Sequence, residues 1–350
     1  MLCQSDYIDM PKRKIKLTGS EKILLVRPDR LGDLILSLPV ASTLKKIYPR
    51  IVIHFLASHY NAQVFNFSPD VDNYILMTES DGKPLKVEKL IGVLEAESYA
   101  VALFLKPSWL SAFAAYIAGI PIRVGTWRRP YSLLFNIREN VRRKYSGIHE
   151  VDLNLMMLRP FGIDVELGTV TPSLKTGFVD GEDDIGLGVD NNYMVIHPFS
   201  KGSAPNWPIQ SYLRLADMLS ENIAVVITGQ YNSQLDISDR IYNLVNKTSF
   251  NQLVSVISRA KLFISGSTGP LHLAAALGTP SLALYPDHPN LGPQRWGPRG
   301  EKVAVLTSCK QNGHKYSIKN NGNNDCMKSI KVNTVFEKAC RMLSDGAMSV

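Results

Sequence analysis

The chain has 350 residues, 45% of them hydrophobic and 20% charged, which is typical of a folded globular protein and excludes a disordered or fibrous one. Its 39 lysines and arginines outnumber its 31 acidic residues. The resulting net charge of +8 favours an anionic partner, namely nucleic acid, a phosphorylated substrate or a membrane surface. Its length suggests two domains.

Two further features concern the membrane and the compartment. The longest nearly uncharged stretch, 107–122, is shorter than the roughly 18 apolar residues that a membrane span needs. The first residues lack the apolar segment of a secretory signal. The four cysteines are irregularly spaced, so we expect neither a disulfide framework nor a zinc site, and a reducing cytoplasm fits best.

Short apolar runs alternate with helical patterns along the whole chain, which predicts βαβ units and parallel sheets. A segment rich in Gly and Asp, 175–192, separates two such halves and is typical of a linker, so we expect a ligand cleft between two domains. The predicted strands are 23–26, 51–56, 74–77, 101–105, 194–197, 224–228, 262–265 and 281–285. The predicted helices are 34–47, 109–118, 209–219 and 269–277.

The loop after the first predicted strand, Arg27 to Asp33, is the first candidate for chemistry. Ligands of open α/β sheets bind at the carboxyl ends of strands, where this loop lies. Asp33 is therefore either a general base that accepts a proton from a hydroxyl or only the cap of the following helix.

Two loops of the second half suit a phosphate. The segment 265–272 places Thr268 and Gly269 at a helix start, where free N–H groups and the helix dipole attract an anion, and His272 lies in the first turn. The loop 197–208 carries Ser200 and Lys201 directly after a strand. The alternatives are a well-capped ordinary helix and a surface loop anchored by Trp207.

A basic cluster interrupted by one acidic residue occupies 123–144. It could bind a phosphorylated or lipid-linked acceptor, anionic headgroups or nucleic acid. The alternative is that the cluster is only a solvated face. No nucleic-acid motif accompanies it. Asp70 and Asp72 follow a proline and are interpreted as a turn, so no metal ligand set is evident. The cluster contains Arg123, Arg128, Arg129, Arg138, Arg142, Arg143 and Lys144.

Six segments then suggest a family. They are VRPDRLGDLILSLP (26–39), GIPIRVG (119–125), GIHEVDLNLMMLRPFGI (147–163), NWP (206–208), STGPLHLAAALGTPSLALY (267–285) and CMKSIKVNTV (326–335). In this order they resemble glycosyltransferase family 9, the ADP-heptose:lipopolysaccharide heptosyltransferase-like enzymes. The resemblance covers 22–340.

The resemblance implies a GT-B fold, in which two Rossmann-like α/β domains face each other across a cleft, and an inverting, metal-independent glycosyltransferase without a cofactor. It implies a nucleotide-sugar donor and a phosphorylated or lipid-linked glycan acceptor of lipopolysaccharide type, contact with the cytoplasmic face of the inner membrane, and no nucleic acid. The expected organisation is a basic leader (1–20), an acceptor-binding domain (21–175), a linker (176–192), a donor-binding domain (193–328) and a C-terminal segment (329–350) whose helix packs back on the first domain. The expected site residues are Asp33 as base, Ser200, Lys201, Ser267, Thr268, Gly269 and His272 for the donor, and Arg30, Arg123, Arg128 and Arg129 for the acceptor.

Three positions on the donor side depart from the family pattern. Residues 204–206 lack a lysine before the Trp-Pro element, Ser267 stands where the heptosyltransferases often have Asp, and 229–233 lack an acidic residue for the ribose. These departures leave the donor sugar and base open. The missing lysine and acidic residue also motivate an alternative, a non-catalytic nucleotide-sugar or glycan-binding protein. A GT-B-like sugar epimerase is a third possibility.

Overall fold

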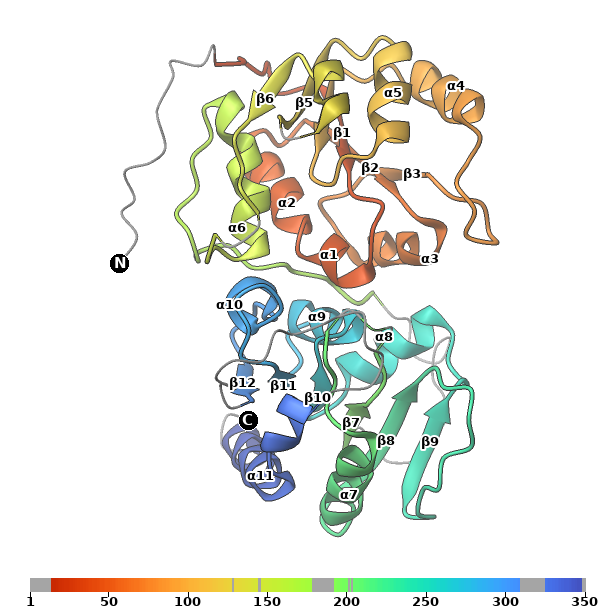
Figure 1. Cartoon of the computed structure of the whole chain (residues 1–350), viewed down its shortest axis with the longest axis vertical. Helices are drawn as coiled ribbons and strands as arrows, with labels where there is room; N and C mark the ends of the chain where they lie inside the picture. Colours follow the sequence, from red (N-terminus) through yellow and green to blue (C-terminus); the bar gives the residue numbers. More distant parts are fainter. Residues whose placement is uncertain are drawn as a thin grey trace.

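The computed structural model describes residues 14–127, 129–143, 146–177, 192–200, 202, 204–308 and 325–347. Within these residues the chain forms two α/β domains, one above the other in Figure 1, each built on a six-stranded parallel sheet. No helix in these ranges is both long and apolar enough to cross a membrane.

The N-terminal sheet has the strand order β3-β2-β1-β4-β5-β6, which is the order of a Rossmann fold. Its strands are β1 (Lys22–Val26), β2 (Val52–Ala57), β3 (Asn73–Leu76), β4 (Val101–Phe104), β5 (Ile122–Thr126) and β6 (Ile137–Glu139). The helices are α1 (Leu31–Ile35), α2 (Leu38–Ile47), α3 (His59–Ala62), α4 (Val87–Glu97), α5 (Trp109–Ile117) and α6 (Glu150–Leu155), with 3₁₀ helices η2 (Gln63–Phe67), η3 (Pro130–Leu134) and η4 (Met156–Phe161).

The C-terminal sheet repeats this order, because β12-β11-β10-β7-β8-β9 is the same sequence of strands read from the opposite edge. Its strands are β7 (Tyr193–His197), β8 (Ala224–Gly229), β9 (Ile241–Val245), β10 (Phe263–Gly266), β11 (Ser281–Tyr285) and β12 (Val303–Thr307). The helices are α7 (Ile209–Leu219), α8 (Phe250–Ser258), α9 (Gly269–Ala276), α10 (Pro293–Trp296) and α11 (Val332–Ala347), with the 3₁₀ helix η5 (Asp325–Ser329).

Both faces of the central strands are buried, as helices on either side of a parallel sheet require. In β1, Leu24 and Val26 pack with α4 and α5, whereas Ile23 and Leu25 pack on the other face with α2 and α6. Successive side chains point to opposite faces of the sheet, and both faces are buried, so the strands appear in the sequence as continuous apolar runs.

The first long helix predicted at 34–47 is in fact two helices, α1 and α2. The chain breaks between them at Ser37, whose hydroxyl donates to the Leu34 carbonyl (2.6 Å). Pro39, which has no N–H, then fits the first turn of α2. The break frees the short helix α1 to carry Asp33 toward the second domain (Figure 1).

The C-terminal helix does not pack back on the first domain, so that prediction is wrong for the described residues. α11 packs against α7 (Figure 1), and Val335 and Ala339 are buried in the core of the C-terminal domain with Tyr212 and Leu215. Its apolar stripe therefore covers one face of the second sheet instead of bridging the two domains.

The predicted leader and linker fall partly outside the described residues. Of the leader 1–20, residues 14–20 are described and lie against the first domain: Leu17 is buried, and the Ile15 N–H donates to the Pro160 carbonyl (2.8 Å). Just before the linker, the Leu174 N–H donates to the Ala276 carbonyl of the second domain (2.9 Å). The Lys175 N–H donates to the Phe67 carbonyl of the first domain (2.8 Å). Backbone hydrogen bonds therefore join the end of the first domain to both domains.

Candidate active site

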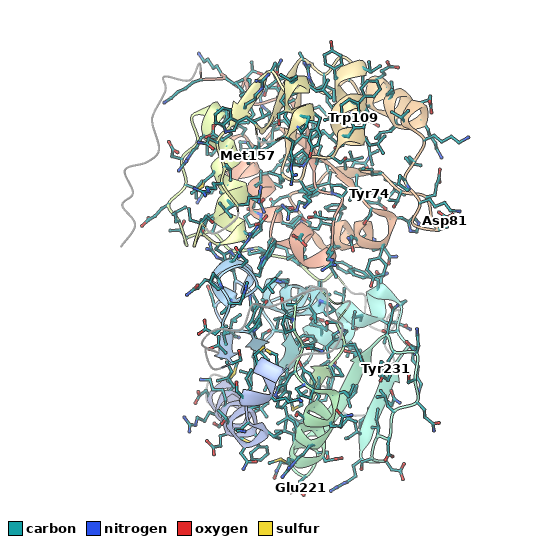
Figure 2. The ribbon with its side chains drawn as sticks, in the orientation of Figure 1. Tyr74, Asp81, Trp109, Met157, Glu221 and Tyr231 are labelled. Atoms are coloured by element: carbon teal, nitrogen blue, oxygen red, sulfur yellow. The ribbon has the colours of Figure 1, made fainter. Side chains whose placement is uncertain are left out.

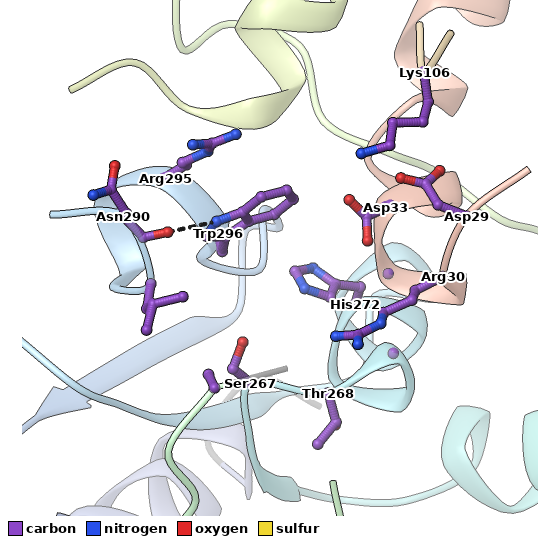
Figure 3. A pocket seen from close by; sticks show the side chains of 14 residues that line it. Asp29, Arg30, Asp33, Lys106, Ser267, Thr268, His272, Asn290, Arg295 and Trp296 are labelled. Atoms are coloured by element: carbon purple, nitrogen blue, oxygen red, sulfur yellow. Dashed lines mark hydrogen bonds between the residues drawn. The ribbon is translucent and has the colours of Figure 1, made fainter. Parts of the chain in front are cut away.

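A cavity of about 370 Å³ opens between the two domains. The N-terminal sheet reverses its strand order between β1 and β4, and the C-terminal sheet does so between β7 and β10. The loops after these four strands all contribute to the cavity wall, at the position where open α/β sheets bind ligands. The lining residues are Asp29, Arg30, Gly32, Asp33, Lys106, Ala204, Ser267, Thr268, Gly269, His272, Asn290, Leu291, Arg295 and Trp296 (Figure 3).

Arg27, at the end of β1, organises the first wall. Its side chain is only 2% exposed, and its guanidinium lies 2.8 Å from an Asp29 carboxylate oxygen and 2.7 Å from Asp33 Oδ1. Burial alone would lower the pKa of Arg27, but the three carboxylates of Asp29, Glu150 and Asp33 outweigh it and raise that pKa. Arg27 therefore remains charged and fixes the direction of the Asp33 carboxylate.

Asp33 lies in the cavity wall and has a raised pKa. Burial raises its pKa to about 6, with help from the negative charges of Asp29 and Glu150, while Arg27 opposes the shift. The side chain keeps 18% exposure and lines the cavity, so a ligand can reach it. A carboxylate whose pKa lies near neutrality is ionised at pH 7 and still basic enough to take a proton from a hydroxyl.

Behind Asp33, Glu150 of α6 binds guanidinium groups from three parts of the chain. Its carboxylate is 3.2 Å from Arg27, forms a short contact with Arg143, and is 3.3 Å from Arg295 of the second domain. Burial acts to raise the pKa of Glu150, but these arginines lower it. Among the described residues, three arginines thus meet three carboxylates in one network, whose charges compensate each other.

His272 of α9 lies next to Asp33 (Figure 3) and is neutral. Burial lowers its pKa to about 3, and the nearby His149 adds to this shift. Its Nδ1 is buried without a hydrogen-bond partner among the described residues. The ring packs so closely on α1 that a Cβ at Gly32 would lie 2.6 Å from its Cδ2 atom. His272 therefore brings α9 against the helix that carries Asp33.

The start of α9 forms the opposite wall. Thr268 is its N-cap, accepting from the Leu271 N–H (3.4 Å), and its hydroxyl lies 2.9 Å from that of Ser265. A Cβ at Gly269 would lie 3.0 Å from Leu31 of α1, so glycine permits this close approach. Pro270 has no N–H and the Leu271 N–H is bound to Thr268, so the Gly269 N–H and the positive end of the helix dipole are what this helix start offers to an anion.

With this geometry in place, comparisons identify the family. A model of glycosyltransferase family 9 (heptosyltransferase) matches residues 87–326. The chain belongs to glycosyltransferase family 9.

Individual relatives agree with this assignment. Lipopolysaccharide heptosyltransferase 2 of Escherichia coli (strain K12) is 28% identical over 314 residues, covering 81% of this chain and 87% of the relative. Lipopolysaccharide heptosyltransferase 3 of the same strain is 28% identical over 282 residues, 73% of this chain and 79% of the relative. The solved structure of E. coli ADP-heptose LPS heptosyltransferase II has a TM-score of 0.74 at 23% identity and covers 93% and 99% of the two chains. The predictions of a transferase and of a GT-B fold are confirmed.

The cavity of this family 9 glycosyltransferase brings together part of the predicted site. Asp33 and Arg30 line one wall, and Ser267, Thr268, Gly269 and His272 line the other. Ser200 is described but does not line the cavity; its hydroxyl accepts from the Gly202 N–H (3.4 Å). Lys201 and Arg128 lie outside the described residues. The predicted roles of all these residues remain predictions.

The described arginines of the basic cluster do not form one continuous binding surface for an acceptor. The guanidinium of Arg123 donates to the backbone carbonyls of Leu134 (2.8 Å) and Ile120 and lies 5.2 Å over the ring of Tyr116. Arg143 turns inward to Glu150. Arg129 is exposed, and neither it nor Arg123 lines the cavity. The cluster was predicted from the charges in the sequence. Hydrogen bonds to backbone carbonyls orient Arg123, and the ion pair with Glu150 orients Arg143.

The predicted turn is confirmed, because the backbone turns at residues 69–70. Asp72 then pairs with Lys45 (2.7 Å) and accepts from the Ile53 N–H (2.7 Å). Across the described ranges, no three side chains of His, Cys, Asp or Glu come together as a metal site. Metal independence itself stays a prediction.

Several lining residues were missed from the sequence. Lys106 follows β4, where the strand order of the first sheet reverses, and extends into the cavity (Figure 3). Its position just after a predicted strand could have identified it. Asn290, Arg295 and Trp296 come from the α10 region, which was assigned no element. The Trp296 indole N–H donates to the Asn290 carbonyl (2.9 Å) and so closes this wall.

Proposed function

We propose that the chain transfers a heptose or related sugar from a nucleotide-sugar to a lipopolysaccharide-type or other glycan acceptor, with inversion and without a metal ion. The observation that carries the proposal is that Asp33 and the start of α9 line one cavity from opposite domains. The cavity volume of about 370 Å³ falls within the range of small-molecule sites, and the residues proposed as base and anion site lie on opposite walls.

The donor occupies the α9 side in this proposal. Its diphosphate lies at the helix start, where the Gly269 N–H and the positive end of the α9 dipole attract it, and where Ser267 and Thr268 line the cavity wall. The negative charge that develops on the leaving diphosphate is stabilised by these fixed dipoles. Because the neutral His272 packs beside Asp33, it adds no positive charge that would weaken the base.

The acceptor occupies the Asp33 side. Asp33 takes the proton of the attacking hydroxyl as its oxygen bonds to the anomeric carbon and the bond to the diphosphate breaks. A single in-line displacement inverts the configuration at that carbon. Arg30 and Lys106, which form no ion pair with a described residue, provide positive charge on this wall for a phosphate or carboxylate of the acceptor.

The test has two stages. A thermal-shift screen of nucleoside diphosphates and nucleotide-sugars first finds the donor, since a ligand of the native state raises the unfolding temperature. Transfer to a lipopolysaccharide core acceptor is then measured with and without EDTA, and NMR of the product gives the anomeric configuration. We expect EDTA-insensitive transfer with inversion.

Other outcomes of the same test would reject the proposal. Donor binding without transfer to any glycan acceptor would favour the non-catalytic binding protein. Turnover of the donor without an acceptor would favour the epimerase. Retention of the anomeric configuration would contradict the mechanism. So would a loss of activity in EDTA that is restored by adding divalent metal. Both results would leave the family assignment intact.

A further inference from the structure

The cavity wall that carries Asp33 holds a second carboxylate. Asp29 lies four residues earlier, in the loop between β1 and α1, and lines the same cavity. Its side chain is 20% exposed, close to the 18% of Asp33. Figure 3 shows the two carboxylates next to each other, on the same side of the cavity as Lys106. A ligand hydroxyl that reaches Asp33 therefore also comes close to Asp29.

Arg27 sets the spacing of these two carboxylates. Its Nε lies 2.8 Å from Asp29 Oδ1, and its Nη2 lies 2.7 Å from Asp33 Oδ1. Nε and Nη2 are neighbouring nitrogens on one edge of a planar, rigid guanidinium, so the two carboxylates lie side by side along that edge. The third nitrogen, Nη1, turns to the interior, where it donates to Glu150 and Asn154 (both 3.2 Å).

Both carboxylates have hydrogen-bonding capacity left for a ligand. Within the described part of the chain, Arg27 is the only residue that pairs with or hydrogen bonds to either of the two side chains. Asp29 Oδ1 is buried against Arg27, which leaves the other oxygen to the cavity side. The Asp29 carbonyl accepts from the side-chain amide of Asn61, a buried residue of α3, so the backbone of this loop is also held in place.

The chemistry of the pair selects hydroxyl groups. An ionised carboxylate only accepts hydrogen bonds and repels phosphate, so we expect an anionic group of the acceptor at Arg30 and Lys106 instead. Sugars carry hydroxyls on neighbouring carbons, and the oxygens of such a pair are about as far apart as two hydrogen-bonded oxygens. Two carboxylates that lie side by side can therefore accept from both hydroxyls at once.

We propose that Asp29 binds the acceptor hydroxyl next to the one that attacks, so that the acceptor presents two adjacent hydroxyls to Asp29 and Asp33. This inference rests on the proposed function and adds which part of the acceptor is recognised. Asp33 takes the proton of one hydroxyl. Asp29 accepts a hydrogen bond from its neighbour and thereby selects which hydroxyl of the sugar attacks.

Acceptors that lack one hydroxyl test the proposal on the native chain. The probe is the smallest lipopolysaccharide-core glycoside to which the native chain transfers. It is compared with two analogues, in which hydrogen replaces the hydroxyl on one or the other side of the attachment carbon. We expect kcat/KM to fall about 10- to 100-fold for one of the two analogues, because that analogue leaves Asp29 without its hydrogen-bond donor.

Asp29→Ala in the full chain then assigns the contact. It should raise the KM for the complete acceptor about 10- to 100-fold and leave the KM for the donor within about twofold. On the sensitive analogue the same substitution should change kcat/KM by no more than about threefold, because the contact is already missing. Asp29→Asn should recover part of the loss, since its amide oxygen still accepts from Arg27 and from a hydroxyl.

Asp81→Ala provides the matched control. Asp81 is an exposed aspartate at the outer edge of the N-terminal domain (Figure 2) and does not line the cavity. This variant should keep both KM values within about twofold of the native chain. Circular dichroism checks that each variant folds, and Asp29→Asn takes the place of Asp29→Ala if the alanine variant does not.

Three results would overturn the inference about Asp29. Full use of both analogues by the native chain would show that no neighbouring hydroxyl is bound. An equal loss on the complete acceptor and on both analogues in Asp29→Ala would show that Asp29 only supports Arg27. A loss of kcat in Asp29→Asn as large as that in Asp33→Asn, on every acceptor, would make Asp29 the base.

These results leave glycosyl transfer itself intact, so they are distinguishable from a failure of the proposed function. That failure would appear with the native chain alone, as an absence of transfer to any glycan, and the inference about Asp29 would then fall with it.

Discussion

At the scale of single residues, the proposed mechanism depends on how Asp33 is held. Arg27 fixes the direction of the carboxylate, while burial keeps its pKa near 6 in spite of that positive charge. A carboxylate paired with an exposed arginine would have a lower pKa and would be a weaker base. The network around Glu150 maintains this balance, because it neutralises part of the positive charge of Arg27.

Replacing Asp33 tests its role as base. We expect Asp33→Asn to lower kcat by about 10²- to 10⁴-fold, since Asn cannot take the proton. For the native chain, kcat/KM should be constant above about pH 6 and fall tenfold per pH unit below it, because only the ionised carboxylate is active. Steady-state rates from pH 4.5 to 8.5 check both. The alternative that Asp33 caps the helix is wrong, because the N-cap of α1 is Arg30 and makes no side-chain cap hydrogen bond. A variant with full activity would therefore leave Asp33 with a structural role only, as a partner of Arg27.

Replacing Glu150 separates positioning from proton transfer. Glu150→Gln leaves three arginines without their shared counter-charge, so we expect a loss of about 3 kcal/mol in the free energy of unfolding. Glu150 raises the pKa of Asp33, so its removal should move the acid limb of kcat/KM to lower pH. Urea unfolding and the pH profile measure these effects.

The exposed Glu88 of α4 provides the control for that variant. It lies in the first turn of the helix, so Glu88→Gln should cost at most about 0.3–1 kcal/mol and leave the pH profile unchanged. If Glu150→Gln destabilised the chain but left the acid limb in place, Glu150 would have a structural role only.

At the scale of elements, the contact of α1 with α9 sets the distance between Asp33 and the start of α9, which are the base and the anion site of the proposed mechanism. Gly32→Ala would place a Cβ 2.6 Å from the buried ring of His272, so the helices must separate. We expect a loss of about 1–3 kcal/mol in stability and a fall in kcat. Chemical unfolding and steady-state assays check this.

Gly92→Ala in α4 is the matched control for Gly32→Ala. A Cβ there meets nothing within 4 Å, so this variant should gain about 0.5–1 kcal/mol from helix propensity and keep its activity. Equal behaviour of the two glycine variants would show that the α1–α9 contact does not position Asp33.

The sequence predicted the central elements well, because buried strands such as β1 and β7 are short runs of apolar residues. It missed the partly exposed strands β5, β6, β9 and β12, of which β5 and β9 have mixed polarity (IRVGT and IYNLV). The start of α9 was recognisable because a capping threonine, glycine and proline are adjacent. The Glu150 network was not, because its arginines come from positions 27, 143 and 295 and meet only in the folded chain.

At the scale of the whole molecule, the cleft is also a packed interface. One continuous hydrophobic core includes Leu31 and Phe67 of the first domain and Leu271 of the second, and the rings of Phe67 and Phe250 lie 6.3 Å apart across it. The His149 ring adds a hydrogen bond to the Gly297 carbonyl (2.8 Å). Since apolar burial is shared between the domains, we expect a single cooperative transition in calorimetry.

The pair between Arg299 and Asp152 tests this coupling. Arg299 binds both oxygens of Asp152, a buried carboxylate on α6, from the opposite domain (Nη1–Oδ1 2.9 Å). Arg299→Ala leaves that charge uncompensated, so we expect a loss of about 3–5 kcal/mol and a broadened or split calorimetric transition as the domains uncouple. Combining it with Asp152→Asn should restore part of the loss, because the unpaired charge is gone. A single transition unchanged in Arg299→Ala would mean that the apolar core alone couples the domains, and the ion pair would then have no measurable part in holding the cleft.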